Sequence, residues 1–169
     1  MHTSDVLIDA YGRIQGVLTR TLTDLNVGEL CFRPKETANS IAWLAWHLTR
    51  VQDHHISGLA KQTQIWISEG WHQKFNMASD PQNIGTGHTP DEVAALVPPD
   101  AATLLAYHNS VAERTKAFVR TLSQQDLDTE LDEPQYTPLP TVGIRLVSVI
   151  SDNSQHAGQA AYLKGIIRN

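Results

Sequence analysis

The sequence predicts an all-α protein, a four-helix bundle with a long connection between the second and third helices. Four stretches of about twenty residues carry apolar side chains at three- and four-residue steps, which places those side chains on one face of a helix. No useful length of chain alternates apolar and polar residues, so little strand is expected. Amphipathic helices in 169 residues bury their apolar faces economically against one another, in one domain over residues 1–169.

The first helix is expected over residues 4–26, with Ser4 or Asp5 placed to cap its first turn. Its apolar stripe comprises Leu7, Ala10, Ile14, Val17, Leu18, Thr21, Leu22 and Leu25. A glycine and a proline then interrupt the periodicity. Residues 27–39 are therefore predicted to form a loop that leads to the second helix.

The second helix is expected over residues 40–59, and it carries a histidine on its apolar side. His47 falls on the same stripe as Leu44 and Val51, so its imidazole is predicted to face the core. A lone histidine in this position is most often satisfied by a backbone carbonyl or a carboxylate. Polar residues on another core stripe would change that interpretation.

Residues 60–90 lose the helical period while tryptophans and glycines accumulate, which indicates a long, partly ordered connection. Connections of this length often cover functional sites. Trp66 and Trp71 have two interpretations: they line the approach to a site together with Arg50, or they pack the connection against the bundle or fill a dimer interface.

The second half of the chain contains two further long helices. Thr89 caps a short helix that two prolines end, and the third long helix follows over residues 101–122. Residues 123–140 are acidic and rich in proline, so they predict a surface connection with an extended piece near residues 135–139. The fourth helix is expected over residues 141–165.

The fourth helix places two ionisable side chains where hydrocarbon would be expected. Its apolar positions are Val142, Leu146, Val149, Ala160 and Leu163. Continuing this stripe from Val149 leads to Asp152 and then to His156, and residues four apart point to the same side of a helix. Burying a carboxylate without a partner costs several kcal/mol. A compensating cation is therefore expected, and a divalent metal is the sharpest candidate.

His47, Asp152 and His156 together supply two imidazoles and one carboxylate. Three protein ligands leave at least one coordination position for water or substrate, as in catalytic zinc sites. The same donor set suits non-haem iron, so zinc, nickel, iron and manganese all stay open. A metal with an open position lowers the pKa of a bound water or thiol and polarises carbonyls, which favours hydrolysis or activation of a thiolate.

The other histidines are weaker candidates for metal ligands. His54 and His55 are adjacent, so at most one of them faces the seam between helices. His72 and His88 lie in the long connection and could reach a metal from outside the helices. His108 lies on the stripe of the third helix, as a rival third ligand or as a histidine hydrogen-bonded at the other end of the bundle.

Composition excludes several classes of function. The net charge is −5 and the 13 Lys and Arg residues are scattered, so a nucleic-acid surface is disfavoured. The chain lacks the features of a signal peptide and has no apolar run of about 18 residues, so no membrane association is expected. Cys31 is the only cysteine, which rules out an internal disulfide and fits a cytoplasmic protein.

Three pieces of the sequence carry a recognisable pattern: NSIAWLAWHLTRVQDH at residues 39–54, GHTPDEV at residues 87–93, and SDNSQHAGQAAYLKG at residues 151–165. They resemble the DinB-like superfamily, the group that includes the DinB/YfiT-like metalloenzymes, and the resemblance covers nearly the whole chain. It implies a four-helix bundle, typically a homodimer, with a nickel- or zinc-type site.

In that family the metal takes one histidine from the second helix and a pair of residues four apart from the last helix. The first falls on His47 and the pair on Asp152 and His156. The commoner pattern has histidine at the position of Asp152, whereas the similar mycothiol-dependent maleylpyruvate isomerases have an acidic residue there. Characterised relatives use low-molecular-weight thiols, such as bacillithiol or mycothiol, in S-transfer or isomerisation.

Two classes of function follow. The first is a metal-dependent enzyme that activates a low-molecular-weight thiol, as an S-transferase or isomerase, or else a water for hydrolysis of an amide or ester. Its partner would be a small-molecule substrate. The second is a non-catalytic bundle in which Asp152, His156 and His47 form a hydrogen-bonded core network, with a structural or stress-related binding role.

Overall fold

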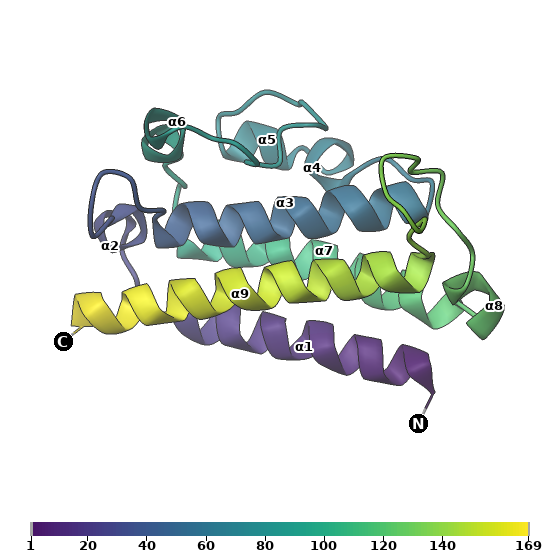
Figure 1. Cartoon of the computed structure of the whole chain (residues 1–169). Helices are drawn as coiled ribbons and strands as arrows, with labels where there is room; N and C mark the ends of the chain where they lie inside the picture. Colours follow the sequence, from purple (N-terminus) through teal and green to yellow (C-terminus); the bar gives the residue numbers. More distant parts are fainter. Residues whose placement is uncertain (1, 169) are drawn as a thin grey trace.

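The computed structural model describes residues 2–168, and over these residues four long helices lie side by side (Figure 1). They are α1 Thr3–Leu22, α3 Ile41–Leu59, α7 Ala101–Thr121 and α9 Val142–Arg168. Helix α9 packs along α3 and α1, and α7 packs along the same two helices from the other side. The predicted all-α bundle, with its long connection between the second and third long helices, is confirmed.

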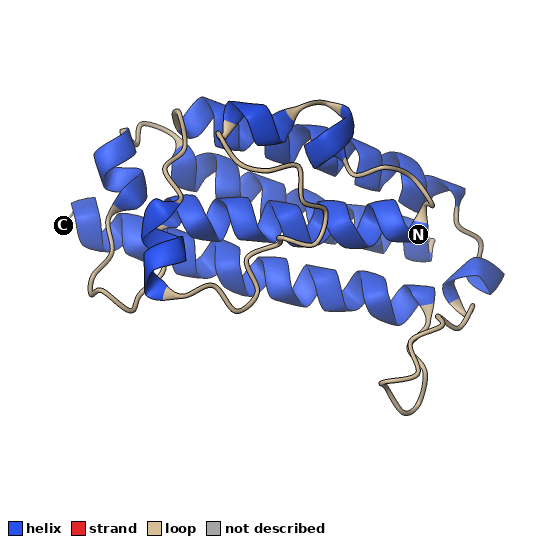
Figure 2. Cartoon of the chain, turned by 90° about the horizontal axis from the view of Figure 1, so that it is seen from above, coloured by secondary structure: helices blue, strands red, loops and turns tan. Residues whose placement is uncertain are grey.

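Short helices occupy much of the chain between the long ones. They are α2 Val27–Cys31, α4 Ile65–Ser68, α5 Trp71–Lys74, α6 Pro90–Ala95 and α8 Gln124–Leu127. Helices α4, α5 and α6 lie along α3 on the side away from α1 (Figure 1). Among the described residues the only pairing of strand type is an isolated bridge between Glu130 and Thr141. The remaining connections are loops, as Figure 2 shows.

Several expected boundaries were wrong. Helix α1 is capped by His2, whose backbone N–H donates to the Asp5 carboxylate, and it ends at Leu22 because Asp24 takes a left-handed conformation with φ 63°. The expected loop after it contains α2, which begins at Val27 and is capped by Asn26. The Asn26 side chain accepts from the backbone N–H of Glu29, and the Glu29 carboxylate accepts in return, which closes a capping box.

The last helix and the connection before it also differ from expectation. Helix α9 continues to Arg168 rather than ending near residue 165. The extended piece expected at residues 135–139 is not a strand.

The core lies between the four long helices and extends beneath the short helices and the connection that pack against α3. Its largest fully buried apolar side chains are Trp46, Trp66, Tyr11, Tyr107, Leu18, Leu22, Leu30, Ile41, Leu44, Leu48 and Ile56. No helix within residues 2–168 combines the length and the apolar character needed to cross a membrane.

A buried carboxylate fixes the start of the long connection on the bundle. Asp53 of α3 accepts hydrogen bonds from the backbone N–H groups of Ile65 and Trp66 at 2.9 and 2.8 Å. It also accepts from the Tyr107 hydroxyl at 2.9 Å and pairs with the Arg50 guanidinium at 3.7 Å. These contacts satisfy a buried charge, so α4 is tied to α3 and α7 by polar bonds as well as by packing.

Arg50 fixes the far end of the same connection. Its guanidinium donates to the carbonyl oxygens of Asp80, Pro81 and Asn83 at 3.1 to 3.3 Å. Arg50 and Trp66 are fully buried and Trp71 nearly so. The interpretation in which these three residues line the approach to a site was therefore wrong, and the packing interpretation of the tryptophans is confirmed.

Candidate metal centre

His47 projects from α3 into the seam with α9, and it is nearly fully buried. Its Nδ1 lies 2.5 Å from the carbonyl oxygen of Ile84, in the connection that Arg50 holds down. A carbonyl can only accept, so Nδ1 carries the proton and Nε2 keeps its lone pair. The Trp43 ring stacks on the imidazole with centroids 4.5 Å apart. The orientation and the tautomer of His47 are thus both fixed by its neighbours.

Gly85 allows the connection to approach His47 this closely. It has a positive φ of 92°, and a Cβ built on it would lie 3.0 Å from His47 Nδ1 and 2.9 Å from the Trp46 ring. Both the backbone conformation and the contact exclude a side chain. The residue next to Ile84 must therefore be glycine for the carbonyl to reach the imidazole.

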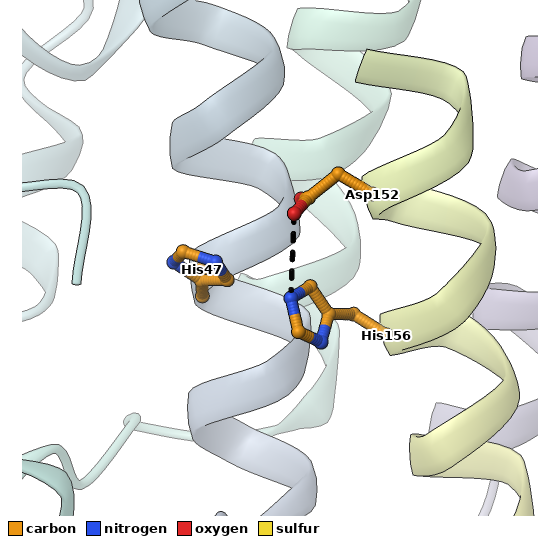
Figure 3. Close-up of side chains that lie close together, drawn as sticks. All are labelled: His47, Asp152 and His156. Carbon is orange, nitrogen blue, oxygen red and sulfur yellow. Dashed lines mark ion pairs between the residues drawn. The ribbon is translucent and has the colours of Figure 1, made fainter. Parts of the chain in front are cut away.

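Asp152 and His156 project from α9 toward His47, and all three side chains converge on one spot (Figure 3). They are half-buried, not core residues as the stripe had predicted. The buried stripe of α9 runs from Val149 through Asn153 and Ala157, one position further along. The two ionisable side chains therefore lie at the border of the core, where α9 meets α3.

The donor atoms of the three residues all lie within 4.8 Å of one another. Asp152 Oδ1 is 3.6 Å from His156 Nε2. The other ring nitrogen of His156, Nδ1, lies 2.9 Å from the side-chain carbonyl oxygen of Gln159. In the neutral ring Nδ1 donates to Gln159 and Nε2 keeps its lone pair, the same tautomer as His47, whereas in the protonated ring Nε2 donates to Asp152.

This arrangement fits a cation. Two imidazole rings and one carboxylate bring their ligand atoms together at one spot. Asp152 Oδ2 is buried and has no hydrogen-bond partner among the described residues. A buried acceptor without a donor is costly, and a divalent metal would satisfy all three groups at once. Among residues 2–168 no other group of His, Cys, Asp or Glu forms such a cluster.

The pKa values of the three residues are shifted in different directions. Burial lowers the pKa of His47, outweighing its hydrogen bond to Ile84, and the positive charge of a protonated His156 acts in the same direction. The contact with Asp152 raises the pKa of His156 against the effect of burial. Burial opposes ionisation of Asp152, but hydrogen bonding and charge from His156 hold its pKa below the usual range. The carboxylate is thus ionised at neutral pH, as a metal ligand must be.

The rival histidines of the bundle are engaged elsewhere. His108 is fully buried, and its Nδ1 lies 3.0 Å from the Thr49 hydroxyl, so it belongs to a core contact between α7 and α3. His88 uses both ring nitrogens: Trp43 donates to Nδ1 at 3.2 Å, and Nε2 lies 2.9 Å from Asn83 Oδ1. Neither histidine joins the cluster.

The remaining candidates also stay outside the cluster. His72 Nδ1 contacts the carbonyl oxygen of Trp66 at 3.1 Å, and His54 Nδ1 contacts that of Pro81 at 3.2 Å. His55 is half-buried, and burial together with the Arg145 charge lowers its pKa to about 4. The negative charge of Asp152 acts in the opposite direction and raises the pKa of His55.

Sequence reasoning missed the groups that orient the ligands. The carbonyl of Ile84 has no side-chain signature, and its role depends on the fold of a long connection. Gly85 lies in the run Ile-Gly-Thr-Gly-His, where glycine spacing could have indicated a tight turn. Gln159 lies three residues after His156, the spacing at which helical side chains meet, and was detectable on that basis.

Comparison with known proteins identifies the fold as that of one family. A family model described as the DinB superfamily matches residues 10–160. A crystal structure described as the conserved protein of locus from Enterococcus faecalis is similar, with 29% sequence identity and a TM-score of 0.89. The similarity covers 97% of this chain and 96% of that chain. No curated protein matches the chain. The chain belongs to the DinB superfamily.

Proposed function

We propose that this member of the DinB superfamily is a metal-dependent enzyme that activates a low-molecular-weight thiol, for S-transfer or isomerisation, on a small-molecule substrate. Activation of a water for hydrolysis is the variant that needs the same ligands and no thiol. His47, Asp152 and His156 would hold one divalent transition metal, with zinc and nickel ahead of iron and manganese. A metal there would lower the pKa of a bound thiol or water and polarise a carbonyl.

One observation carries the proposal: the ligand atoms of two imidazoles and one carboxylate converge within 4.8 Å of one another. With Nδ1 of His47 and His156 engaged by Ile84 and Gln159, the Nε2 atoms of both neutral rings are available to a metal. One oxygen of the Asp152 carboxylate is buried without a partner among the described residues. Three ligands are fewer than a structural zinc site uses. A coordination position would remain for the substrate.

The chain itself supplies orientation and access. Ile84 and Trp43 fix the imidazole of His47, and its burial keeps water from that side of the centre. The opposite side is open, because the Asp152 side chain is 37% exposed and that of His156 is 19% exposed. A small molecule can therefore approach over α9 while the α3 side holds the centre in place.

The alternative is a non-catalytic bundle with a hydrogen-bonded core network, in which the same residues stabilise one another. Its support is the ion pair between Asp152 and His156. Against it, a structural network satisfies its buried acceptors, whereas Asp152 Oδ2 has no donor within residues 2–168. Because Asp152 is half-exposed, an ion pair with His156 would also contribute little to the stability of the fold.

Cobalt(II) titration followed by addition of glutathione tests the thiol chemistry. Cobalt bound to the three ligands is expected to develop a near-ultraviolet thiolate charge-transfer band when glutathione is added. The variant His156→Ala should lose both the cobalt spectrum and the band, whereas the exposed control His2→Ala should retain them. Cobalt binding without a band for glutathione or cysteine would refute thiol activation and leave hydrolysis. A wild type that binds no cobalt would favour the non-catalytic bundle.

A further inference from the structure

Arg145 lies on the same side of α9 as the candidate metal centre. It precedes Asp152 by almost two helical turns, so their backbones are separated by about 10 Å along the axis. Ser148, one turn from Asp152, lies between them on that side. Helices α3 and α9 run antiparallel (Figure 1), and His55, near the end of α3, lines the same cavity as Arg145.

Two cavities meet at Arg145. One, of about 310 Å³, lies between the start of α9 and the loop before it, and its lining includes Tyr136, Pro140 and Ser148. The other, of about 270 Å³, lies at the end of α3 and is lined by His55 and Glu133 among others. Arg145 forms part of the wall of both. The positively charged Arg145 therefore lies between two cavities, at one end of the α3–α9 seam that carries the metal ligands.

The guanidinium of Arg145 has unused hydrogen-bonding capacity. Its Nη2 donates to the Glu133 carboxylate, and the group lies 5.9 Å from the centre of the Tyr136 ring. Nε is buried and has no partner among the described residues. The side chain is only 13% exposed. An arginine offers five N–H donors in a planar fork that suits a carboxylate, so one partner leaves most of that fork unused.

Glu133 belongs to the loop between α8 and α9, which packs over the end of the seam (Figure 1). Its contact with Arg145 joins this loop to α9. The carboxylate of Glu133 therefore already occupies one edge of the guanidinium, in the way an external carboxylate would.

We propose that Arg145 anchors a carboxylate of the small molecule whose reactive group reaches the metal centre, and that Glu133 occupies this anchor in the free protein. The inference rests on the proposed function for the position of the reactive group, but the anchor itself does not require a metal. It deepens that function by naming the substrate class: a carboxylate-bearing molecule about as long as a tripeptide, since roughly 10 Å separates the two ends.

The local charge favours a monoanion over a phosphate dianion. Asp132 and Glu133 line the same cavity as Arg145, so two carboxylates and one guanidinium contribute to the charge of its wall. His55 adds no positive charge at neutral pH, because burial and Arg145 lower its pKa to about 4. Replacing one carboxylate by another preserves this balance, whereas a dianion would lack a counter-charge.

Calorimetric titration of the metal-free protein with S-methylglutathione tests the anchor. The blocked thiol removes any contribution from the metal centre. Glu133→Gln should bind the probe at least about tenfold more tightly than the wild type, because the internal competitor is lost while the anchor stays. Adding Arg145→Gln to the Glu133→Gln variant should abolish this increase in affinity. The diethyl ester of the probe, which has no free carboxylate, should bind Glu133→Gln no more tightly than the wild type.

The ion pair between Arg13 and Asp9 provides matched controls, because both side chains are well exposed on α1. Asp9→Asn and Arg13→Gln should leave binding of the probe unchanged. If Glu133→Gln binds S-methylglutathione no more tightly than the wild type, the proposal is overturned. This outcome does not depend on whether the arginine variant folds. Tighter binding of inorganic phosphate than of the carboxylate probe would overturn the substrate class. A wild type that binds no metal would refute the proposed function and leave this result standing.

Discussion

The tautomers of two histidines determine what the candidate centre can bind. His47 and His156 each donate from Nδ1 to an oxygen, of Ile84 and Gln159 respectively, and therefore present Nε2 to Asp152. The three donor residues could be named from the sequence, because an ionisable pair four residues apart on one helix and a histidine on another apolar stripe are visible in the pattern. Their supports could not, since a backbone carbonyl carries no side-chain signature.

Gly85 provides a test at the scale of one residue. Gly85→Ala should weaken metal binding by about 10- to 100-fold, because a Cβ would displace the Ile84 carbonyl or the His47 ring. Titration with a chromophoric competitor chelator measures the affinity. Gly87→Ala is the matched control: its φ is also positive, at 80°, but no atom lies within 4 Å of the added Cβ. Equal affinities in both variants would refute the role of this close approach.

The helices show where a sequence pattern stops being sufficient. On α9 the stripe was continued from Val149 to Asp152, but the buried position is Asn153. The next position on the same face of a helix is three or four residues further along, which from Val149 is Asp152 or Asn153. Both residues are polar, so hydrophobicity did not distinguish them. Asn153 is buried because its side-chain amide donates to Gln52 Oε1 at 2.8 Å, a partner on another helix. Such pairings depend on the register between helices, which one helix's pattern does not contain.

Polar bonds hold the connection between α3 and α7 over the bundle. Asp53→Ala should lower the free energy of unfolding by about 3–5 kcal/mol, because it leaves the Arg50 charge buried and two backbone N–H groups without their acceptor. Urea denaturation measures this change. The exposed control Asp9→Ala should cost no more than about 1 kcal/mol. A loss that small for Asp53→Ala would show that packing alone holds the connection.

At the scale of the whole molecule, the bundle was predictable because four long apolar stripes dominate the sequence. The short helices α4 and α5 were missed because they have no local periodicity of their own. Tertiary contacts, such as the Asp53 bonds to Ile65 and Trp66, stabilise them instead. The homodimer expected from the family resemblance stays a prediction.

Stability of the metal-free protein should depend on pH through His108. Burial lowers its folded-state pKa to about 4, whereas the unfolded chain has the ordinary value of 6.5. Between these values the unfolded state binds more protons, so stability is full above pH 6.5 and falls as the pH drops toward 4. The total loss is about 3 kcal/mol at 1.36 kcal/mol per pKa unit.

Urea denaturation at pH 7 and pH 4.5, with a chelator present, checks this expectation. His108→Gln should reduce the difference in stability between the two pH values, whereas the exposed control His2→Gln should not. An equal pH dependence in the wild type and His108→Gln would assign the effect to other groups.

The central claim is that His47, Asp152 and His156 hold one divalent metal. The most direct measurement is metal content per chain, by plasma mass spectrometry, on untagged wild type and Asp152→Ala, with Ser151→Ala as the control on the neighbouring exposed position. We predict about one transition metal per chain in the wild type and the control, and loss of that metal in Asp152→Ala. A metal-free wild type that cannot be reloaded, or full occupancy in Asp152→Ala, would contradict the account.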